Sequence, residues 1–143
     1  MKLIEQGGIF MYPLIICSIV MVAIISERGY IYFKTMQKPL IYMENPTQVV
    51  KNLRKRLITL NTIIAISPML GLLGTITGLM KSFSLLGDVR VSSYKPQQIS
   101  LGISEALITT AAGLIIAVIA TIFYNYFTSR LESYVEEYNS TEV

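Results

Sequence analysis

Two hydrophobic stretches without a charged residue, Leu57–Met80 and Ala106–Ser129, constrain the fold more than any other feature of the chain. A hydrocarbon core of roughly 30 Å needs about 20 apolar residues in a helix, so each stretch can cross a bilayer. In both stretches the small and polar residues fall on a single helical face. A simple lipid anchor needs no such sorting, so we expect both helices to pack against other helices and to hold polar groups at membrane depth.

The composition also fits a membrane protein, since 52% of the 143 residues are hydrophobic and 15% are charged. A third apolar run, Ile9–Ser26, follows a single base, Lys2, and lacks a small-x-small cleavage pattern. We therefore expect it to be a retained span rather than a cleaved signal peptide. The prediction is an all-α membrane protein with one domain over residues 1–143 and transmembrane helices at about 9–26, 57–80 and 103–129.

The distribution of Lys and Arg predicts the orientation of these spans. Eight of the 12 bases lie in segments 27–56 and 130–143, and the others lie before residue 9 or in segment 81–101. We therefore expect the amino terminus outside and the carboxyl terminus inside. Segment 27–56 is then a cytoplasmic loop, 81–101 a periplasmic loop and 130–143 a cytoplasmic tail.

The two cytoplasmic segments are expected to be partly helical. The loop contains prolines and should form two short helical pieces joined at Glu44–Pro46. Its basic stretch, residues 51–57, fits either a helix end whose bases reach toward lipid headgroups or a partner-binding patch. The tail should continue the third helix, because apolar residues recur in it at helical spacing: Leu131, Tyr134, Val135 and Tyr138.

Small residues occupy one arc of the second predicted span, and large apolar residues occupy the opposite arc. Small residues let helix backbones approach closely, which drives helix association in lipid. Pro68 should kink this helix or loosen one turn. The small-residue arc consists of Ser67, Pro68, Gly71, Gly74, Thr75 and Gly78.

The third predicted span is sorted in the same way. The arc opposite its small and polar residues, from Leu107 to Ile122, suits lipid or apolar packing. The polar arc suits a protein-lined or water-filled interior, and we expect Gly113 and Ala117 to serve helix packing. The whole arc consists of Glu105, Ala106, Thr109, Thr110, Gly113, Ala117, Ala120 and Thr121.

Four polar residues are candidates for an ion pathway: Thr75, Glu105, Thr109 and Thr110. Glu105 is the acid embedded in a membrane-spanning pattern, and such a group is by default a candidate functional residue. Alternatively, it lies in a first helical turn, where exposed N–H groups favour a carboxylate. Each threonine could likewise only bond the carbonyl one turn back.

Several chemistries have no residues to support them. Histidine is absent, and the single cysteine, Cys17, lies inside an apolar run. No nucleophile–base pair, metal-ligand cluster or phosphate-binding glycine loop is visible, so we expect no catalytic residue, cofactor, metal site or nucleic-acid partner. No Asp or Lys lies at mid-membrane, so a proton-conducting complex would take that acid from a partner.

Two long motifs carry a resemblance to a known family. Residues 67–83, SPMLGLLGTITGLMKSF, resemble the second-span motif of the MotA/TolQ/ExbB proton-channel family, and residues 101–114, LGISEALITTAAGL, resemble its third-span motif. Residues 8–30 are similar to the family's first span. The ExbB branch is the most similar and TolQ is next.

The resemblance implies a subunit of a pentameric motor in the bacterial inner membrane. The pentamer would surround the single helices of an ExbD- or TolR-like dimer, whose membrane aspartate relays protons. Thr75 and Thr110 would line the pore, with Glu105 at its outer end. A TonB-like protein would then deliver force for nutrient import, or the Tol system would use it for outer-membrane upkeep.

The chain departs from the family pattern at Thr77 and Ser104 and in its short loop and tail. These departures concern the choice of branch rather than the pore residues. A non-conducting scaffold for the partner helices is the alternative function. The residues do not discriminate between H⁺ and Na⁺ as the ion.

Overall fold

The computed structural model describes residues 8–42, 44–87 and 96–142. The regular structure in these residues is helical throughout, which confirms the predicted all-α class. Three stretches in them are long and apolar enough to cross a membrane, as predicted: Met11–Thr35, Pro46–Ser84 and Ile99–Ser140.

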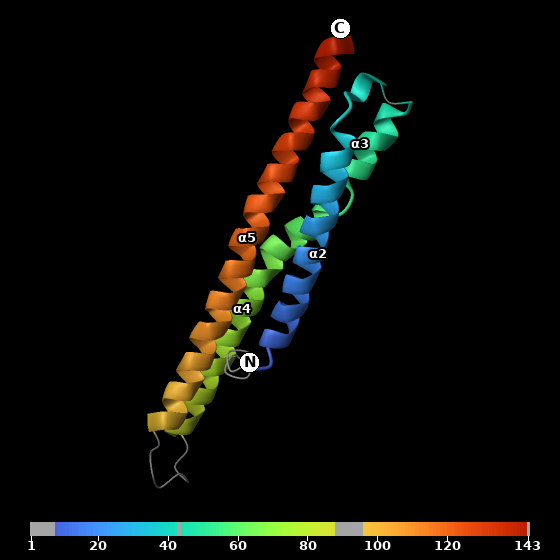
Figure 1. Ribbon diagram of the computed structural model, residues 1–143. Coiled ribbons are helices and arrows are strands. Elements are labelled where there is room, and N and C mark those ends of the chain that lie inside the picture. Colours follow the sequence, from blue (N-terminus) through green and yellow to red (C-terminus); the bar gives the residue numbers. More distant parts are fainter. Residues whose placement is uncertain (1–7, 43, 88–95, 143) are drawn as a thin grey trace.

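The described helices run in two opposite directions. Helices α2 and α5 point one way, and α3 and α4 point the other way (Figure 1). Prolines open α3 and α5, at positions where a missing backbone N–H removes no helical hydrogen bond. The elements in chain order are α2 (Met11–Thr35), the short 3-10 helix η1 (Leu40–Tyr42), α3 (Pro46–Arg54), α4 (Leu57–Gly87) and α5 (Pro96–Glu142).

Each long helix extends beyond the span that the sequence predicts. Helix α2 continues through Glu27 and Arg28, because charged residues end an apolar run without ending a helix. Parts of the expected loops 27–56 and 81–101 are therefore helical. The tail continues α5 without a break, and the second helical piece of the loop begins at Pro46, both as expected.

Helices α4 and α5 lie side by side and share the most extensive contact in the structure (Figure 1). Helix α2 packs against both, and its Leu14 and Met21 belong to the same buried core as Leu60 of α4. The tail takes part in this packing, since Leu131 and Tyr134 are buried and Val135 and Tyr138 are partly buried against the core.

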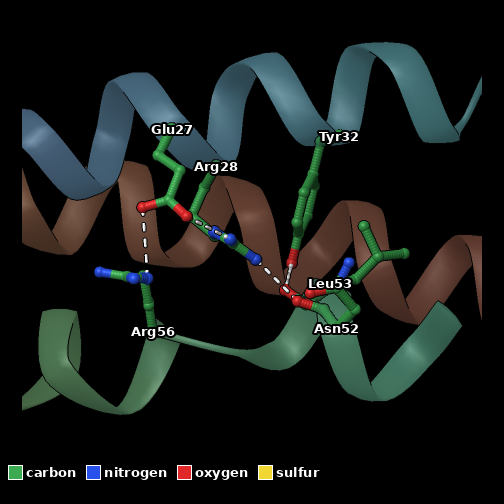
Figure 2. Close-up of polar contacts among 6 residues, drawn as sticks. All are labelled: Glu27, Arg28, Tyr32, Asn52, Leu53 and Arg56. Atoms are coloured by element: carbon green, nitrogen blue, oxygen red, sulfur yellow. Dashed lines mark hydrogen bonds and ion pairs between the residues drawn. The ribbon is translucent and has the colours of Figure 1, made fainter. Parts of the chain in front are cut away.

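A cluster of polar contacts joins the carboxyl-terminal part of α2 to the end of α3 (Figure 2). The guanidinium of Arg28 is buried; its Nη1 donates to the carbonyl of Asn52 at 2.7 Å and its Nη2 to the Glu27 carboxylate at 2.9 Å. The Tyr32 hydroxyl donates to the carbonyl of Leu53 at 2.7 Å. Carbonyls in the last turn of a helix have no intrahelical partners, so α2 side chains cap α3.

The same cluster holds the turn between α3 and α4. Arg56, the second residue after the end of α3, adopts a left-handed backbone conformation with φ of 72°. A residue of this conformation commonly ends a helix, and glycine usually occupies it. The side chain of Arg56 pairs with Glu27 at 3.2 Å. We call this group, formed by Glu27, Arg28, Tyr32, Asn52, Leu53 and Arg56, the α2–α3 clasp.

The clasp is not among the features predicted from the sequence, where Arg28 counts as one of the bases of segment 27–56. A signal was present in the spacing. Arg28 and Tyr32 continue the steps of three and four residues that separate the buried positions of α2: Leu14, Cys17, Met21 and Ile24. A charged residue on the buried face of a helix indicates a specific partner.

We expect changes in the clasp to lower the free energy of unfolding measured by denaturant titration in mixed micelles. Arg28→Met removes two charge-assisted hydrogen bonds and should cost about 2 kcal/mol, whereas Tyr32→Phe removes one neutral bond and should cost about 1 kcal/mol. Tyr30→Phe is the matched control, because Tyr30 is exposed on the same helix. Equal losses for Tyr30→Phe and Tyr32→Phe would contradict the capping role.

Candidate ion pathway between α4 and α5

Glycines bring the backbones of α4 and α5 into direct contact. A Cβ added to Gly71 would lie 2.9 Å from the carbonyl oxygen of Thr109 and 3.1 Å from the Cα of Thr110. A Cβ on Gly113 would overlap the carbonyl of Ser67. Since backbone atoms cannot move away as a flexible side chain can, these positions require glycine for the helices to approach this closely.

Two more of the predicted packing residues, Gly74 and Gly78, lie along the same interface. Gly74 faces Cβ and Cγ2 of Thr109, and a Cβ on Gly78 would lie 2.5 Å from the carbonyl oxygen of Gly102. Ala117 of α5 is buried. Pro68 is half-buried, and α4 continues through it as one helix.

Two threonine hydroxyls meet across this interface. Thr75 Oγ1 of α4 and Thr110 Oγ1 of α5 are in direct contact. Both hydroxyls also lie close to the same two carbonyl oxygens, Gly71 O of α4 and Ala106 O of α5. Thr75 Oγ1 is 3.1 Å from each of them. Thr110 Oγ1 is 3.3 Å from Gly71 O and 3.1 Å from Ala106 O. We refer to Thr75 and Thr110 as the hydroxyl pair.

The hydroxyl pair has more acceptors than protons. Its two protons can point to either of two carbonyls or to the other hydroxyl, so the donors can reorient without becoming unpaired. A hydroxyl that accepts one bond while donating another can also hydrogen-bond a water or a protonated group. The pair therefore supplies adaptable polar contacts between two otherwise apolar helices.

Thr109 lies on a different side of α5 from the hydroxyl pair. It is fully buried, its hydroxyl donates to the carbonyl of Glu105, and its Cβ and Cγ2 face Gly74. Thr121 lies farther along α5, with its hydroxyl 2.6 Å from the carbonyl of Ala117. The structure thus brings together two of the four predicted pathway residues and places Thr109 in the packing contact.

Glu105 lies one and a half turns before Thr110 on α5. Its carboxylate is 3.6 Å from the ammonium of Lys81 on α4, and Gly8 lies against it. Both charged residues line an open groove of about 810 Å³ together with Thr77 and Leu101. This groove gives the carboxylate contact with solvent at one end of the α4–α5 interface.

The first-turn interpretation of Glu105 is wrong. Helix α5 begins at Pro96, nine residues earlier, so the backbone N–H groups near Glu105 are already within the helix. The favourable partner of the carboxylate is the Lys81 ammonium instead.

The chain matches a known family over most of its length. Residues 21–140 match the MotA/TolQ/ExbB proton channel family. The biopolymer transport protein ExbB of Aquifex aeolicus is 32% identical over 130 residues, which cover 91% of this chain and 83% of that protein.

Two further relatives match shorter segments. The biopolymer transport protein ExbB-like 3 of Synechocystis sp. is 46% identical over 88 residues, 61% of this chain and 42% of that protein. The Tol-Pal system protein TolQ of Haemophilus influenzae is 34% identical over 91 residues, 64% of this chain and 39% of that protein. The chain thus spans less than half of the length of these two relatives.

We expect Gly113→Ala to destabilise the protein by about 1–3 kcal/mol, because the new methyl group overpacks against the backbone at Ser67. Gly29→Ala is the matched control, since nothing lies within 4 Å of a Cβ there. That change should stabilise α2 by up to about 1 kcal/mol through helix propensity. The measurement is again unfolding in mixed micelles, and a harmless Gly113→Ala would refute the close backbone contact.

Proposed function

The chain belongs to the MotA/TolQ/ExbB proton channel family, and from this we propose that it is the channel subunit of a motor in the bacterial inner membrane. Several copies, five by resemblance to the family, form a ring around the single membrane helices of an ExbD- or TolR-like partner. Proton flow through the ring drives the partner, and a TonB-like protein carries the force toward the outer membrane for nutrient import.

The hydroxyl pair is the observation that supports this proposal. It places Thr75 and Thr110 together at the interface between two membrane-spanning helices, five residues beyond the solvent-accessible carboxylate of Glu105. Five residues correspond to about 7.5 Å along a helix. A carboxylate at the mouth followed by adaptable hydroxyls is an arrangement that can pass protons between water and a buried acid.

The buried acid itself comes from the partner in this proposal. The chain has no Asp, Glu, Lys or Arg in Leu57–Met80 or Ala106–Ser129. Hydroxyl groups can orient and exchange hydrogen bonds, but they do not hold a charge at neutral pH. A membrane aspartate on the partner helix would supply the group that is protonated on one side and deprotonated on the other.

A non-conducting scaffold is the second candidate function, and one observation favours it. Thr75 and Thr110 each lie within hydrogen-bond distance of the carbonyl four residues earlier, as threonines in purely structural helices do. In a scaffold the hydroxyl pair would only fasten α4 to α5. A TolQ-like role in outer-membrane integrity would keep the channel and change the process that it drives.

The proposed orientation follows from the positive charges. The amino terminus lies outside, and the α2–α3 clasp, α3 and the end of α5 lie in the cytoplasm, where the excess of Lys and Arg is expected. Glu105 and Lys81 then lie at the periplasmic end of the α4–α5 interface, where protons enter under the normal membrane potential.

We expect Thr110→Val to abolish proton flux into liposomes that hold this chain with its Asp-bearing partner, while the complex remains intact. Flux should fall to the level of liposomes without the partner, because valine keeps the volume but removes the hydroxyl. Glu105→Ala should have the same effect by removing the carboxylate at the mouth. The readout is a pH-sensitive dye under an imposed K⁺ diffusion potential.

Thr62→Val is the matched control for this experiment. Thr62 makes the same bond to the carbonyl four residues back, at 3.0 Å, but is exposed on α4. Loss of flux in Thr110→Val with normal flux in Thr62→Val supports the channel. Normal flux in both Thr110→Val and Glu105→Ala refutes this path, and absence of flux in the intact native complex favours the scaffold or Na⁺ as the ion.

A further inference from the structure

Helix α3 presents a basic face away from the protein. Leu53 is buried and Val49 and Val50 are half-buried, which fixes the inward side of the helix. Lys51 of α3 and Lys55, the residue that caps the end of the helix, are both exposed and line one groove on the outward side.

The end of α5 presents an acidic face in the same manner. Leu131 and Tyr134 are buried and fix the inward side of this part of the helix. Glu132 and Glu136 are exposed and four residues apart, so their carboxylates lie next to each other on the outward side.

These two faces lie at the same level along the bundle. At one end of α3, Pro46 lines a pocket with Tyr138 of α5. At the other end, Tyr32 donates to the carbonyl of Leu53 and packs edge-on against the ring of Phe127, with centroids 5.1 Å apart. The α5 segment that runs beside α3 therefore includes both glutamates.

The lysines and glutamates have complementary charges but no ion pairs with each other in the chain. Within residues 8–42, 44–87 and 96–142, charged side chains elsewhere are paired, such as Glu27 with Arg28 and Arg56 and Lys81 with Glu105, whereas these two lysines and two glutamates take part in no ion pair. The basic and acidic faces point away from their shared core, so they cannot meet within one copy.

Neighbouring copies in a membrane can bring the two faces together. All copies insert with the same orientation and at the same depth, so a contact between them joins residues at the same level. A contact between two different faces of the same chain is head-to-tail, and it generates a closed ring when the rotation permits.

We propose that a charged seam joins adjacent copies of this chain, in which Lys51 and Lys55 of one copy pair with Glu132 and Glu136 of the next. This inference rests on the proposed function, because it supposes the ring. The seam fixes the register and handedness of the ring outside the bilayer, while apolar faces of α4 and α5 pack within it. Electrostatic complementarity contributes mainly such specificity.

A lipid surface accounts for only half of this arrangement. Anionic headgroups attract the lysines of α3, but they repel the glutamates of α5 at the same level. A second copy satisfies both faces at once, and therefore the observations favour it over lipid as the partner.

Carbodiimide cross-linking of the native chain in membranes tests the seam directly, because it couples Lys to Glu only where they form an ion pair. A mixture of ¹⁵N-labelled and unlabelled chains distinguishes links between copies from links within one. We expect mixed-isotope peptides that join the α3 lysines to the α5 glutamates. High salt present during the reaction should reduce their yield, because salt screens exposed ion pairs.

Charge reversal provides the second measurement. Lys51→Glu with Lys55→Glu, and Glu132→Lys with Glu136→Lys, should each cause loss of the ring in native mass spectrometry from detergent. All four changes in one chain should restore it. The matched control, Lys34→Glu with Lys38→Glu, reverses two exposed bases four residues apart on another face and should leave the ring intact.

The outcomes separate this inference from the proposed function. If the ring persists in both charge-reversal variants, or if cross-links between copies join only other residues, the seam is overturned and the channel proposal is unaffected. If the cross-links form and the chain with all four changes restores the ring, but the native complex shows no proton flux, this inference is supported and the channel proposal is contradicted. A native chain that stays monomeric overturns both, and circular dichroism of each variant establishes that a lost ring is not a lost fold.

Discussion

The rest of the structure depends on the close approach of α4 and α5. In lipid, apolar side chains gain nothing by leaving their surroundings, so two helices associate only if their backbones pack closely or if polar groups meet between them. This interface uses both means, because Gly71 and Gly113 admit backbone atoms and the hydroxyl pair bonds across the gap. Large apolar residues such as Leu72 and Leu114 remain on the outer faces, where lipid or partner helices can cover them.

Much of this arrangement could be predicted from the sequence, for a physical reason. A membrane allows few secondary structures, so long apolar runs predict helices, and helical periodicity then predicts which faces pack. The fold class, the three spans and the helical tail follow from these rules. The small-residue arcs of both helices indicate the interface at Gly74 and Gly113, and the structure places these residues there.

Features that depend on helix ends or on single side chains were harder to predict from the sequence. The first-turn interpretation of Glu105 failed because the helix starts at Pro96, outside the apolar run that marks the span. Thr109 and Thr110 are adjacent in sequence, yet Thr110 meets the hydroxyl of Thr75 whereas Thr109 packs against Gly74, since consecutive helical residues point about 100° apart. The apolar run ends at Ser26, which suggests that Arg28 is a loop base, whereas the helix and its buried face continue to Tyr32.

The positions of the charged side chains are consistent with the close packing of α4 and α5. Along α4 and α5 the chain keeps charged side chains out of the apolar stretches and gathers them at the two ends, with Glu105 and Lys81 at one and the clasp at the other. A charge between these helices would compete with the backbone contact that holds them together, because it would require solvation in the space that the glycines close. Hydroxyls avoid this conflict, since they bond to helix carbonyls when nothing else is present and can turn to another group when it arrives. In the ring proposed above, such subunits would form neutral walls, and the charge that moves through the membrane would therefore belong on the partner helix.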